Sequence, residues 1–226
     1  PPVHHRPVAG RGPGWMIAEL TYDCPLSCSY CSNPVAMSDY HRDRRSALPV
    51  NQQEHLPSLT ADGWRNVIDQ AADLGVVQVG FTGGEPLLRP DLEELVSVAR
   101  GHGMYTNLIT SAVGLSRSRL QKLVSAGLDS VQVSFQADSA ERNDLISGRS
   151  NSYAAKMKSI ALIKETTDLP LTLNVVLHRH NIDRIQEILD MCDSLQPDYV
   201  ELANCQYHGW AMANVEQLLP TPQQVR

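Results

Sequence analysis

Hydrophobic and polar positions alternate along the chain in a strand-then-helix rhythm that begins at Trp15. The apolar stretches that we expect to be strands are 15–22, 76–82, 105–111, 128–137, 169–178 and 198–205. Segments with the apolar spacing of amphipathic helices lie at 58–75, 89–103, 116–127, 140–147, 152–166 and 181–195. Thr60 is a plausible N-cap of the first helix, and Gly75 follows its end. The pattern predicts six β/α units and, because the strands are nearly continuous apolar runs, a parallel sheet buried on both faces.

Two α/β folds fit this alternation, a partial TIM-like barrel and an open doubly wound sheet. Polar side chains follow several expected strands, as in the segments NLITS, SFQA, NVVLHRHN and ELANCQYHGW. Barrel enzymes build their sites at the carboxyl ends of many strands, whereas a doubly wound sheet gathers ligands at one switch point. The first strand is not followed by a G-x-G-x-x-G dinucleotide fingerprint. We therefore expect a partial (β/α)6 TIM-like barrel, because six units fall short of the eight of a closed barrel.

Two stretches stand outside this rhythm. Residues 1–14 are rich in Pro and Gly and show no periodicity, so we expect a flexible N-terminal arm. Residues 36–59 form a long connection before the first helix. Connections of this length are uncommon unless they are functional or disordered. The rest of the chain, residues 15–226, is expected to form one core domain.

Composition narrows the class of protein. The 226 residues are 42% hydrophobic and 19% charged, which suits one well-buried globular core. A net charge of −6 does not indicate nucleic-acid binding, and no apolar run approaches the ~20 residues of a membrane helix. The N-terminal residues lack the apolar region of a signal peptide, and the five cysteines do not resemble a secreted disulfide framework. We expect a cytoplasmic protein with no membrane or nucleic-acid partner.

The densest chemical signal is the segment CPLSCSYC, in which Cys24, Cys28 and Cys31 have the spacing C-x3-C-x2-C. Disulfides need an even number of cysteines, and a structural zinc site needs four ligands, usually in two C-x2-C-type pairs. No second pair follows. Cys192 falls on the apolar side of an expected helix and is interpreted as a core residue. Cys205 ends the last expected strand, where a lone cysteine is more often structural.

Three thiolates suit an iron–sulfur cube with one open iron. A 4Fe–4S cluster normally takes four thiolates, so three leave one iron free to bind a small molecule. A loop of eight residues can place each sulfur at a different corner, with Pro25 stiffening the loop and Tyr30 beside the last cysteine. Placed just after the first strand, this motif resembles that of the radical S-adenosylmethionine (SAM) superfamily. The resemblance implies that Cys24, Cys28 and Cys31 hold the cluster and that SAM binds its open iron.

A second motif, FTGGEP, follows the second expected strand. Gly83 and Gly84 permit close backbone approach, and Glu85 places a carboxylate at the strand end. Taken alone, this segment could be a glycine-rich βα turn with an exposed glutamate. The resemblance implies instead that the motif binds the amino group of the SAM methionine. It also implies that three further residues contact the SAM carboxylate or ribose, unless they satisfy backbone groups inside the barrel: Asn107, Ser134 and Asn174.

Longer segments narrow the resemblance. AELTYDCPLSCSYCSNP, GFTGGEPLLRPDLEELV, YTNLITSAVGL, GLDSVQVSFQA, LNVVLHRHNID and ELANCQYHGWA together are similar to the PqqE family of pyrroloquinoline quinone biosynthesis. That family joins a glutamate and a tyrosine side chain of the precursor peptide PqqA by a carbon–carbon bond, with the peptide chaperone PqqD as partner. The resemblance implies an oxidoreductase on a partial barrel of the radical SAM type. An external donor would supply the electron that cleaves SAM, and the resulting 5′-deoxyadenosyl radical would abstract hydrogen from the glutamate.

Two features depart from that family. Its members carry a C-terminal SPASM domain whose cysteines hold auxiliary clusters, whereas this sequence ends at LLPTPQQVR, so we expect no SPASM domain in this chain. The connection at 36–59 is also expanded. Two other functions stay open: a radical SAM enzyme that modifies a different peptide, and a non-catalytic peptide-binding module stabilised by a cluster or by zinc. The GGE motif argues against the module, because a scaffold has no need of a site for the SAM ammonium group.

Overall fold

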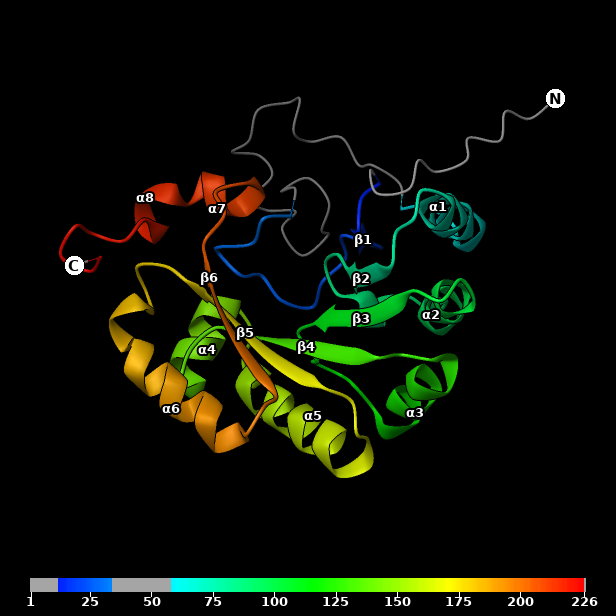
Figure 1. Cartoon of the computed structure of the whole chain (residues 1–226). Helices are drawn as coiled ribbons and strands as arrows, with labels where there is room; N and C mark the ends of the chain where they lie inside the picture. The colour runs from blue at the N-terminus through cyan, green and yellow to red at the C-terminus, as the bar shows by residue number, and fades with distance from the viewer. Residues whose placement is uncertain (1–11, 34–57, 226) are drawn as a thin grey trace.

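The computed structural model describes residues 12–33 and 58–225. Its centre is a six-stranded parallel sheet (Figure 1). The strands are β1 (Trp15–Glu19), β2 (Gln78–Thr82), β3 (Tyr105–Thr110), β4 (Ser130–Phe135), β5 (Leu171–Leu177) and β6 (Tyr199–Asn204). Each lies within a segment that the hydrophobic pattern predicts as a strand.

Helices alternate with these strands, also as expected. They are α1 (Ala61–Asp73), α2 (Leu92–Gly101), α3 (Arg117–Ala126), α4 (Ala140–Ser147), α5 (Ser152–Thr166), α6 (Ile185–Leu195), α7 (Gly209–Ala213) and α8 (Val215–Leu218), with the 3-10 turns η4 (Pro86–Leu88) and η5 (Ile182–Arg184). The Thr60 side chain accepts a hydrogen bond from the Gly63 N–H at 3.2 Å, which confirms Thr60 as the N-cap of α1. Gly75 follows α1 with a φ of +88°.

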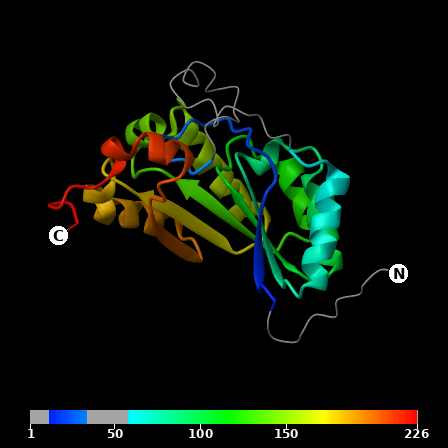
Figure 2. The ribbon, with the colours of Figure 1, turned by 90° about the horizontal axis from the view of Figure 1, so that it is seen from above.

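The strand order identifies the fold. Neighbours in sequence are neighbours in the sheet, in the order β1-β2-β3-β4-β5-β6, and every pair is parallel. A doubly wound sheet reverses its strand order at the switch point, and this sheet does not. In the described residues β6 forms no ladder with β1, so the ring stays open. The sheet curves into an arc with α1 to α6 on its outer side (Figure 2), which confirms the partial (β/α)6 TIM-like barrel.

The hydrophobic core lies between the convex face of this arc and the helices. Its central residues have no exposed surface; they include Val79, Phe81, Leu95, Leu108, Leu123, Val133, Phe135, Leu173 and Ile188. They come from the middle strands and from the inner faces of α2, α3 and α6. This main core fixes the strands, and with them the positions of the loops at their carboxyl ends.

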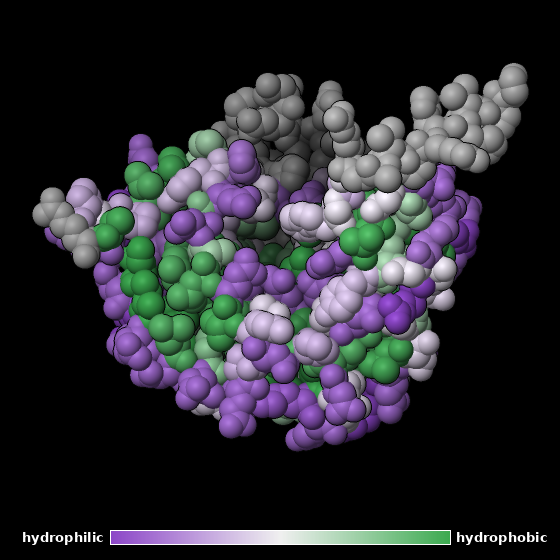
Figure 3. Space-filling model, in the orientation of Figure 1, coloured by the Kyte–Doolittle hydropathy of each residue, from purple (hydrophilic) through white to green (hydrophobic). Residues whose placement is uncertain are grey.

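The concave face differs from the sequence-based expectation. Trp15, Ile17 and Tyr199 are 61%, 41% and 67% exposed, so a sheet buried on both faces is the wrong prediction. Along β3, buried residues alternate with more exposed ones, as in a sheet with one covered face. The reason is the open ring, because the described residues include no further strands to cover the concave side. Figure 3 shows a hollow at the centre of the molecule.

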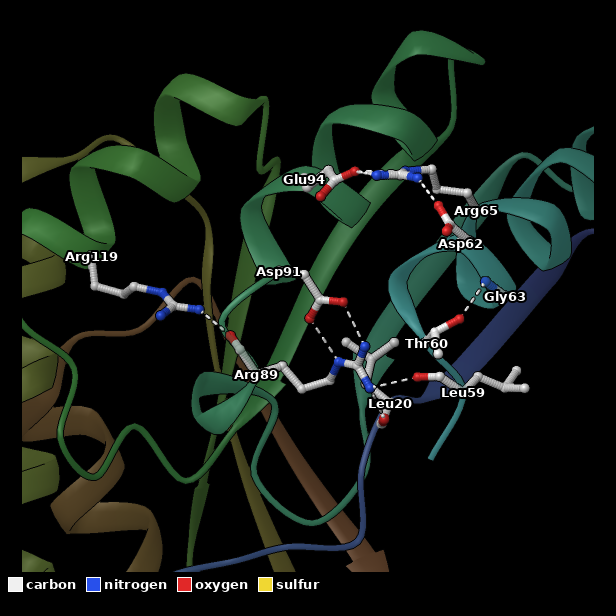
Figure 4. A network of polar contacts seen from close by, with 10 residues as sticks. All are labelled: Leu20, Leu59, Thr60, Asp62, Gly63, Arg65, Arg89, Asp91, Glu94 and Arg119. Carbon is white, nitrogen blue, oxygen red and sulfur yellow. Dashed lines mark hydrogen bonds and ion pairs between the residues drawn. The ribbon is translucent and has the colours of Figure 1, made fainter. Parts of the chain in front are cut away.

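A partly buried arginine ties the end of β1 to the neighbouring helices. The Arg89 guanidinium donates to the carbonyl oxygens of Leu20 and Leu59, both at 3.0 Å, and forms a bidentate pair with Asp91 at 2.8 and 2.6 Å (Figure 4). Arg119 donates to the Arg89 carbonyl oxygen at 2.5 Å. The side chains of Arg89 and Asp91 are only 12% and 16% exposed. Leu20 lies just before the cysteine segment, so this network fixes where that segment begins.

Some expectations fall outside the described residues. Residues 1–11 of the expected arm and 34–57, which include most of the expected long connection, are among these, so both stay predictions. Of the helices in the described ranges, none is both long enough and apolar enough to cross a membrane.

Replacing Arg89 by methionine should lower the free energy of unfolding by about 2 kcal/mol, because the partly buried Asp91 and the carbonyl oxygens of Leu20 and Leu59 then lose their donor. Arg65 provides a matched control. It pairs with Asp62 and Glu94 at the surface (Figure 4), and R65M should cost much less stability than R89M because solvent screens exposed ion pairs. Urea denaturation measures both values, and equal losses in the two variants would contradict the role given to Arg89.

Candidate functional site

The cysteine loop, residues 20–33, follows β1 and crosses the carboxyl ends of the strands (Figures 1 and 2). Cys24, Cys28 and Cys31 are all free and half-buried. The Leu26 N–H donates to Cys24 Sγ at 3.4 Å, and the Cys31 N–H donates to the Cys28 carbonyl oxygen at 3.1 Å. The loop therefore folds back on itself, as one that presents three sulfurs to a common ligand must do.

The end of α4 holds the first half of the cysteine loop. The Ser27 N–H donates to the Ser147 carbonyl oxygen at 2.8 Å, and Arg149 donates to the Pro25 carbonyl oxygen at 3.2 Å. Both contacts use backbone atoms of the loop. They fix its path without engaging the thiols, which stay available as ligands.

The segment around α7 holds the second half of the loop. The Ala211 N–H donates to the Cys31 carbonyl oxygen at 2.9 Å, and the Asn214 amide donates to the Ser29 carbonyl oxygen at 3.1 Å. These contacts join residues nearly two hundred positions apart in the chain, as the sequence separation of 185 for the second shows. The loop is thus a part of the fold and not an independent metal-binding hairpin.

The glycine turn after β2 closes the loop from a third side. The Gly84 N–H donates to the Thr21 carbonyl oxygen at 2.5 Å, and the Asn33 amide donates to the Gly83 carbonyl oxygen at 2.9 Å. A Cβ on Gly83 would lie 2.2 Å from the Thr21 carbonyl oxygen, and one on Gly84 would lie 2.2 Å from the carbonyl oxygen of Asp23. Gly83 also has a φ of +134°, which other residues rarely adopt. Only glycine permits this contact, so the two motifs found in the sequence form one site.

Burial raises the pKa of all three thiols. The pKa of Cys28 rises to about 12, to which Cys31 also contributes, whereas Lys156 and a hydrogen bond with Tyr30 lower it. Cys24 is likewise raised first by burial and further by its two partner cysteines. The thiols are therefore close enough for their charges to interact. A cationic metal centre removes this penalty by stabilising the thiolates.

The donor set fits a cluster with three protein ligands. In residues 12–33 and 58–225, no three His, Cys, Asp or Glu side chains converge on a single metal-ion position. In a 4Fe–4S cluster each cysteine sulfur binds a different iron, so the three sulfurs need not converge on one point. The absence of a converging group in the described residues therefore excludes only sites for a single metal ion, such as zinc. Cys192 lies in the main core, which confirms its structural interpretation. Cys205 packs in a small separate core with Ala211 and Leu218.

Glu85 is fully buried and fully hydrogen-bonded. One carboxylate oxygen accepts from the Thr110 hydroxyl at 2.5 Å and from the Leu87 N–H at 3.1 Å. The other accepts from the Ser111 hydroxyl at 2.5 Å and from its N–H at 2.9 Å. The alternative of an exposed glutamate in a glycine-rich turn is therefore wrong. Glu85 also contributes, after burial, to the raised pKa of Cys24, which places its charge near the thiols.

The three other residues expected to contact SAM do not lie together. Ser134 and Asn174 are direct partners in the β4–β5 register. Within the described ranges neither side chain makes a hydrogen bond to another protein group, so both are available to a ligand. Asn107 is instead paired with Ser130, whose hydroxyl donates to the Asn107 amide oxygen at 3.0 Å. Ser130 begins β4, so Asn107 lies deeper in the barrel than the other two.

Lys156 is a member of the site that the sequence does not indicate. It lies on α5 with no exposed surface, and its ammonium group donates to the Ser134 carbonyl oxygen at 2.7 Å and to the Gln136 side chain. Gln136 in turn donates to the Tyr30 hydroxyl at 2.8 Å. A lysine in a helical segment ordinarily faces water, so the hydrophobic pattern carries no signal for its burial.

The family model of the Radical SAM superfamily matches residues 18–192. This chain belongs to the radical SAM superfamily. Enzymes of this superfamily use a 4Fe–4S cluster and SAM, which are the two cofactors expected from the cysteine and glycine motifs. The match runs from β1 into α6 and therefore contains both motifs.

Solved structures of radical SAM proteins share the fold. SuiB of Streptococcus suis bound to the precursor peptide SuiA matches with a TM-score of 0.69 and 20% identity over 87% of this chain and 40% of that chain. The anSMEcpe structure with bound AdoMet and Kp18Cys peptide matches with a TM-score of 0.64 and 16% identity, over 84% of this chain and 50% of that chain. TYW1 with a lysine-pyruvate adduct matches with a TM-score of 0.59 and 15% identity, over 85% of this chain and 65% of that chain. At these identities the likeness shows the fold alone, and this chain spans less than two thirds of each.

Gly84→Ala should displace the cysteine loop, because the added Cβ meets the Asp23 carbonyl oxygen. We expect the free energy of unfolding to fall by about 2 kcal/mol and the iron bound per chain to fall after anaerobic reconstitution. Gly101→Ala is the matched control, since nothing lies within 4 Å of its Cβ position. A G84A protein with the stability and iron content of the wild type would contradict the close approach.

Acid should destabilise the protein through His178, which has no exposed surface and packs its ring 5.1 Å from that of Tyr30. Burial, then the neighbouring His180, lowers the pKa of His178 to about 4, whereas an unfolded histidine titrates near ~6.5. The unfolded chain therefore binds more protons between these values. This contribution to stability is complete above pH ~6.5 and is lost as the pH falls towards ~4.

His178→Gln should remove up to about 3 kcal/mol of this pH dependence. The free energy of unfolding measured across that pH window tests the prediction, with His102→Gln as a surface control. An unchanged slope in H178Q would show that acid acts on other groups.

Proposed function

We propose that residues 15–226 form the radical SAM core domain of a PqqE-type enzyme of pyrroloquinoline quinone biosynthesis. The enzyme would join a glutamate and a tyrosine side chain of the precursor peptide PqqA, with PqqD as peptide chaperone and an external electron donor. The observation that carries the proposal is the cysteine loop closed against the GGE turn, formed by segments that resemble the PqqE family. No other pair of motifs in the sequence indicates a different chemistry.

Peptide modification is supported by two of the similar structures. SuiB is bound to the precursor peptide SuiA, and anSMEcpe holds AdoMet together with a peptide. The concave face of this sheet is partly exposed, at Trp15 and Ile17 of β1 and at Tyr199 of β6, which leaves room for a peptide on this side of the barrel. A peptide substrate therefore agrees with the open side of the barrel.

Each residue of the site has a part in this proposal. Cys24, Cys28 and Cys31 hold the cluster, which supplies the single electron that cleaves bound SAM. The GGE motif, Gly83 to Glu85, receives the SAM ammonium group, and the bonds of the Glu85 carboxylate to the end of β3 hold this turn beside the thiols. The available side chains at the ends of β4 and β5, Ser134 and Asn174, contact the SAM carboxylate or ribose. Asn107 contacts the same part of SAM through its amide nitrogen, because the Ser130 hydroxyl engages only its amide oxygen.

A different precursor peptide is the second candidate substrate. SuiB, which shares this fold, is bound to SuiA, so the barrel is compatible with peptides other than PqqA. The order of the strands and the cysteine loop would be the same in either case. Only a reaction with a defined peptide distinguishes the two.

Cys28→Ala should abolish cluster binding and SAM cleavage together, because a cube held by only two thiolates loses one of its three anchors. The measurement is 5′-deoxyadenosine formed after anaerobic reconstitution and addition of dithionite, SAM and a PqqA-type peptide. Cys192→Ala removes a thiol from the core and should retain product formation. Full activity in C28A would contradict the assignment of the cluster ligands.

The peptide product of the wild-type chain tests the substrate. If the proposal is right, the product peptide has two hydrogen atoms fewer than the PqqA-type substrate and carries a new carbon–carbon bond between the glutamate and tyrosine side chains. 5′-Deoxyadenosine with an unchanged PqqA-type peptide would favour the different precursor. A complete cluster with no 5′-deoxyadenosine would favour the non-catalytic binding module.

A further inference from the structure

Lys156 is the one lysine or arginine of the described residues with no exposed surface. Its ammonium group bonds to two neutral acceptors, the Ser134 carbonyl oxygen and the Gln136 amide oxygen, and lies 5.5 Å from the centre of the Phe135 ring. Within the described ranges it forms no ion pair with a carboxylate. A buried charge is costly unless an opposite charge lies near it, so the position of the nearest anions decides what Lys156 does.

Most of the acidic groups whose charge acts on Lys156 belong to the cysteine site. Burial lowers the pKa of Lys156 to about 8, and the groups that oppose this effect are, in order, Cys28, Glu85, Cys24 and Asp144. In return, Lys156 lowers the pKa of Cys28. Ligand thiolates of the cluster are therefore among the groups that compensate the buried ammonium charge.

A directed chain of hydrogen bonds connects the lysine to Cys28. The Lys156 ammonium donates to the amide oxygen of Gln136, and the amide nitrogen of Gln136 donates to the Tyr30 oxygen at 2.8 Å. Because the Tyr30 oxygen accepts this bond, its own hydrogen is available to the sulfur of Cys28, two residues earlier in the loop, and this donor lowers the pKa of Cys28. Every donor in the chain points from the ammonium group towards the thiolate, so the polarity is the one that stabilises negative charge on sulfur.

The middle of this chain is fixed by the fold. Gln136 is 1% exposed, its N–H donates to Asn143 at 3.3 Å, and its carbonyl oxygen accepts from Asn181 at 3.0 Å. Because its backbone and both side-chain polar atoms are engaged, Gln136 cannot turn without breaking several bonds. The hydrogen-bond chain from Lys156 to Tyr30 is therefore held in place by the fold.

We infer that Lys156 is the counter-charge of the iron–sulfur cluster and a positioning residue that acts through Gln136 and Tyr30 to raise its reduction potential. The inference rests on the cluster of the proposed function but not on the identity of the peptide. Net charge and hydrogen bonds to the ligand sulfurs set the potential of a cluster. Reduction adds negative charge to a centre already held by thiolates, so a buried positive charge and a sulfur-directed hydrogen bond both favour the reduced state.

The test is a redox titration of the reconstituted chain without SAM or peptide. Lys156→Met keeps the shape of the stem and removes the charge, so the cluster potential should become more negative and the reduced fraction at a fixed poise should fall several-fold. Lys156→Arg keeps the charge and should restore part of the potential. Lys164→Met is the matched control on the same helix, because Lys164 is exposed and bonds only to the carbonyl oxygens of Leu195 and Gln196.

Tyr30→Phe provides a second variant, since it removes only the hydroxyl that accepts from Gln136. It should shift the potential in the same direction, and the K156M and Y30F shifts should not add, because both variants interrupt one chain. This variant keeps the inference testable if K156M does not fold.

Three outcomes would overturn the inference. Reduction potentials equal to that of the wild type in both K156M and Y30F would show that the hydrogen-bond chain does not affect the potential of the cluster. An unchanged SAM-free potential with weaker SAM binding in K156M would make Lys156 a cation for SAM instead. A wild-type chain that holds no cluster after reconstitution would overturn the proposed function and this inference together.

Discussion

The close approach of two backbone turns determines the rest of the site. The carbonyl oxygens of Thr21 and Asp23 lie where side chains at Gly83 and Gly84 would otherwise be, and hydrogen bonds join the two turns at 2.5 and 2.7 Å. This contact places the cysteine loop of β1 beside the carboxylate that follows β2. The ends of α4 and α7 then hold the loop from the other side. A bulkier turn would separate the thiols from Glu85 and the glycine turn.

Charge balance explains why the site is built of buried groups. Three thiols and Glu85 lie near one another, and burial alone would keep the thiols protonated, as their raised pKa values show. The fold provides neutral donors for Glu85, from Thr110 and Ser111, and a buried ammonium group on the far side of Tyr30. A cationic cluster supplies the remaining positive charge.

The sequence predicts the elements of this fold well because the units are regular. The six strands and the ranges of α4 and α5 agree with the hydrophobic pattern, and two spaced motifs indicate the cysteine loop and the glycine turn. The sequence does not predict which side chains the tertiary structure brings together or buries. Asn107 lies in a strand that ends in polar residues. How far it lies from the carboxyl end of the sheet depends on the strand register, which pairs it with Ser130 and not with Ser134. Lys156 is buried because α5 packs under β4, and no local pattern contains that information. The two-sided burial expected of the sheet is wrong because it depends on closure of the ring, which apolar strands alone do not determine.

The central claim is that Cys24, Cys28 and Cys31 hold a 4Fe–4S cluster whose fourth iron binds SAM. Electron paramagnetic resonance of the reconstituted, dithionite-reduced chain, recorded with and without SAM, tests it most directly. The account predicts the signal of a reduced 4Fe–4S cluster that changes when SAM is added, because SAM becomes a ligand of one iron. A cluster signal that SAM leaves unchanged, or zinc in place of iron in anaerobically purified protein, would contradict it.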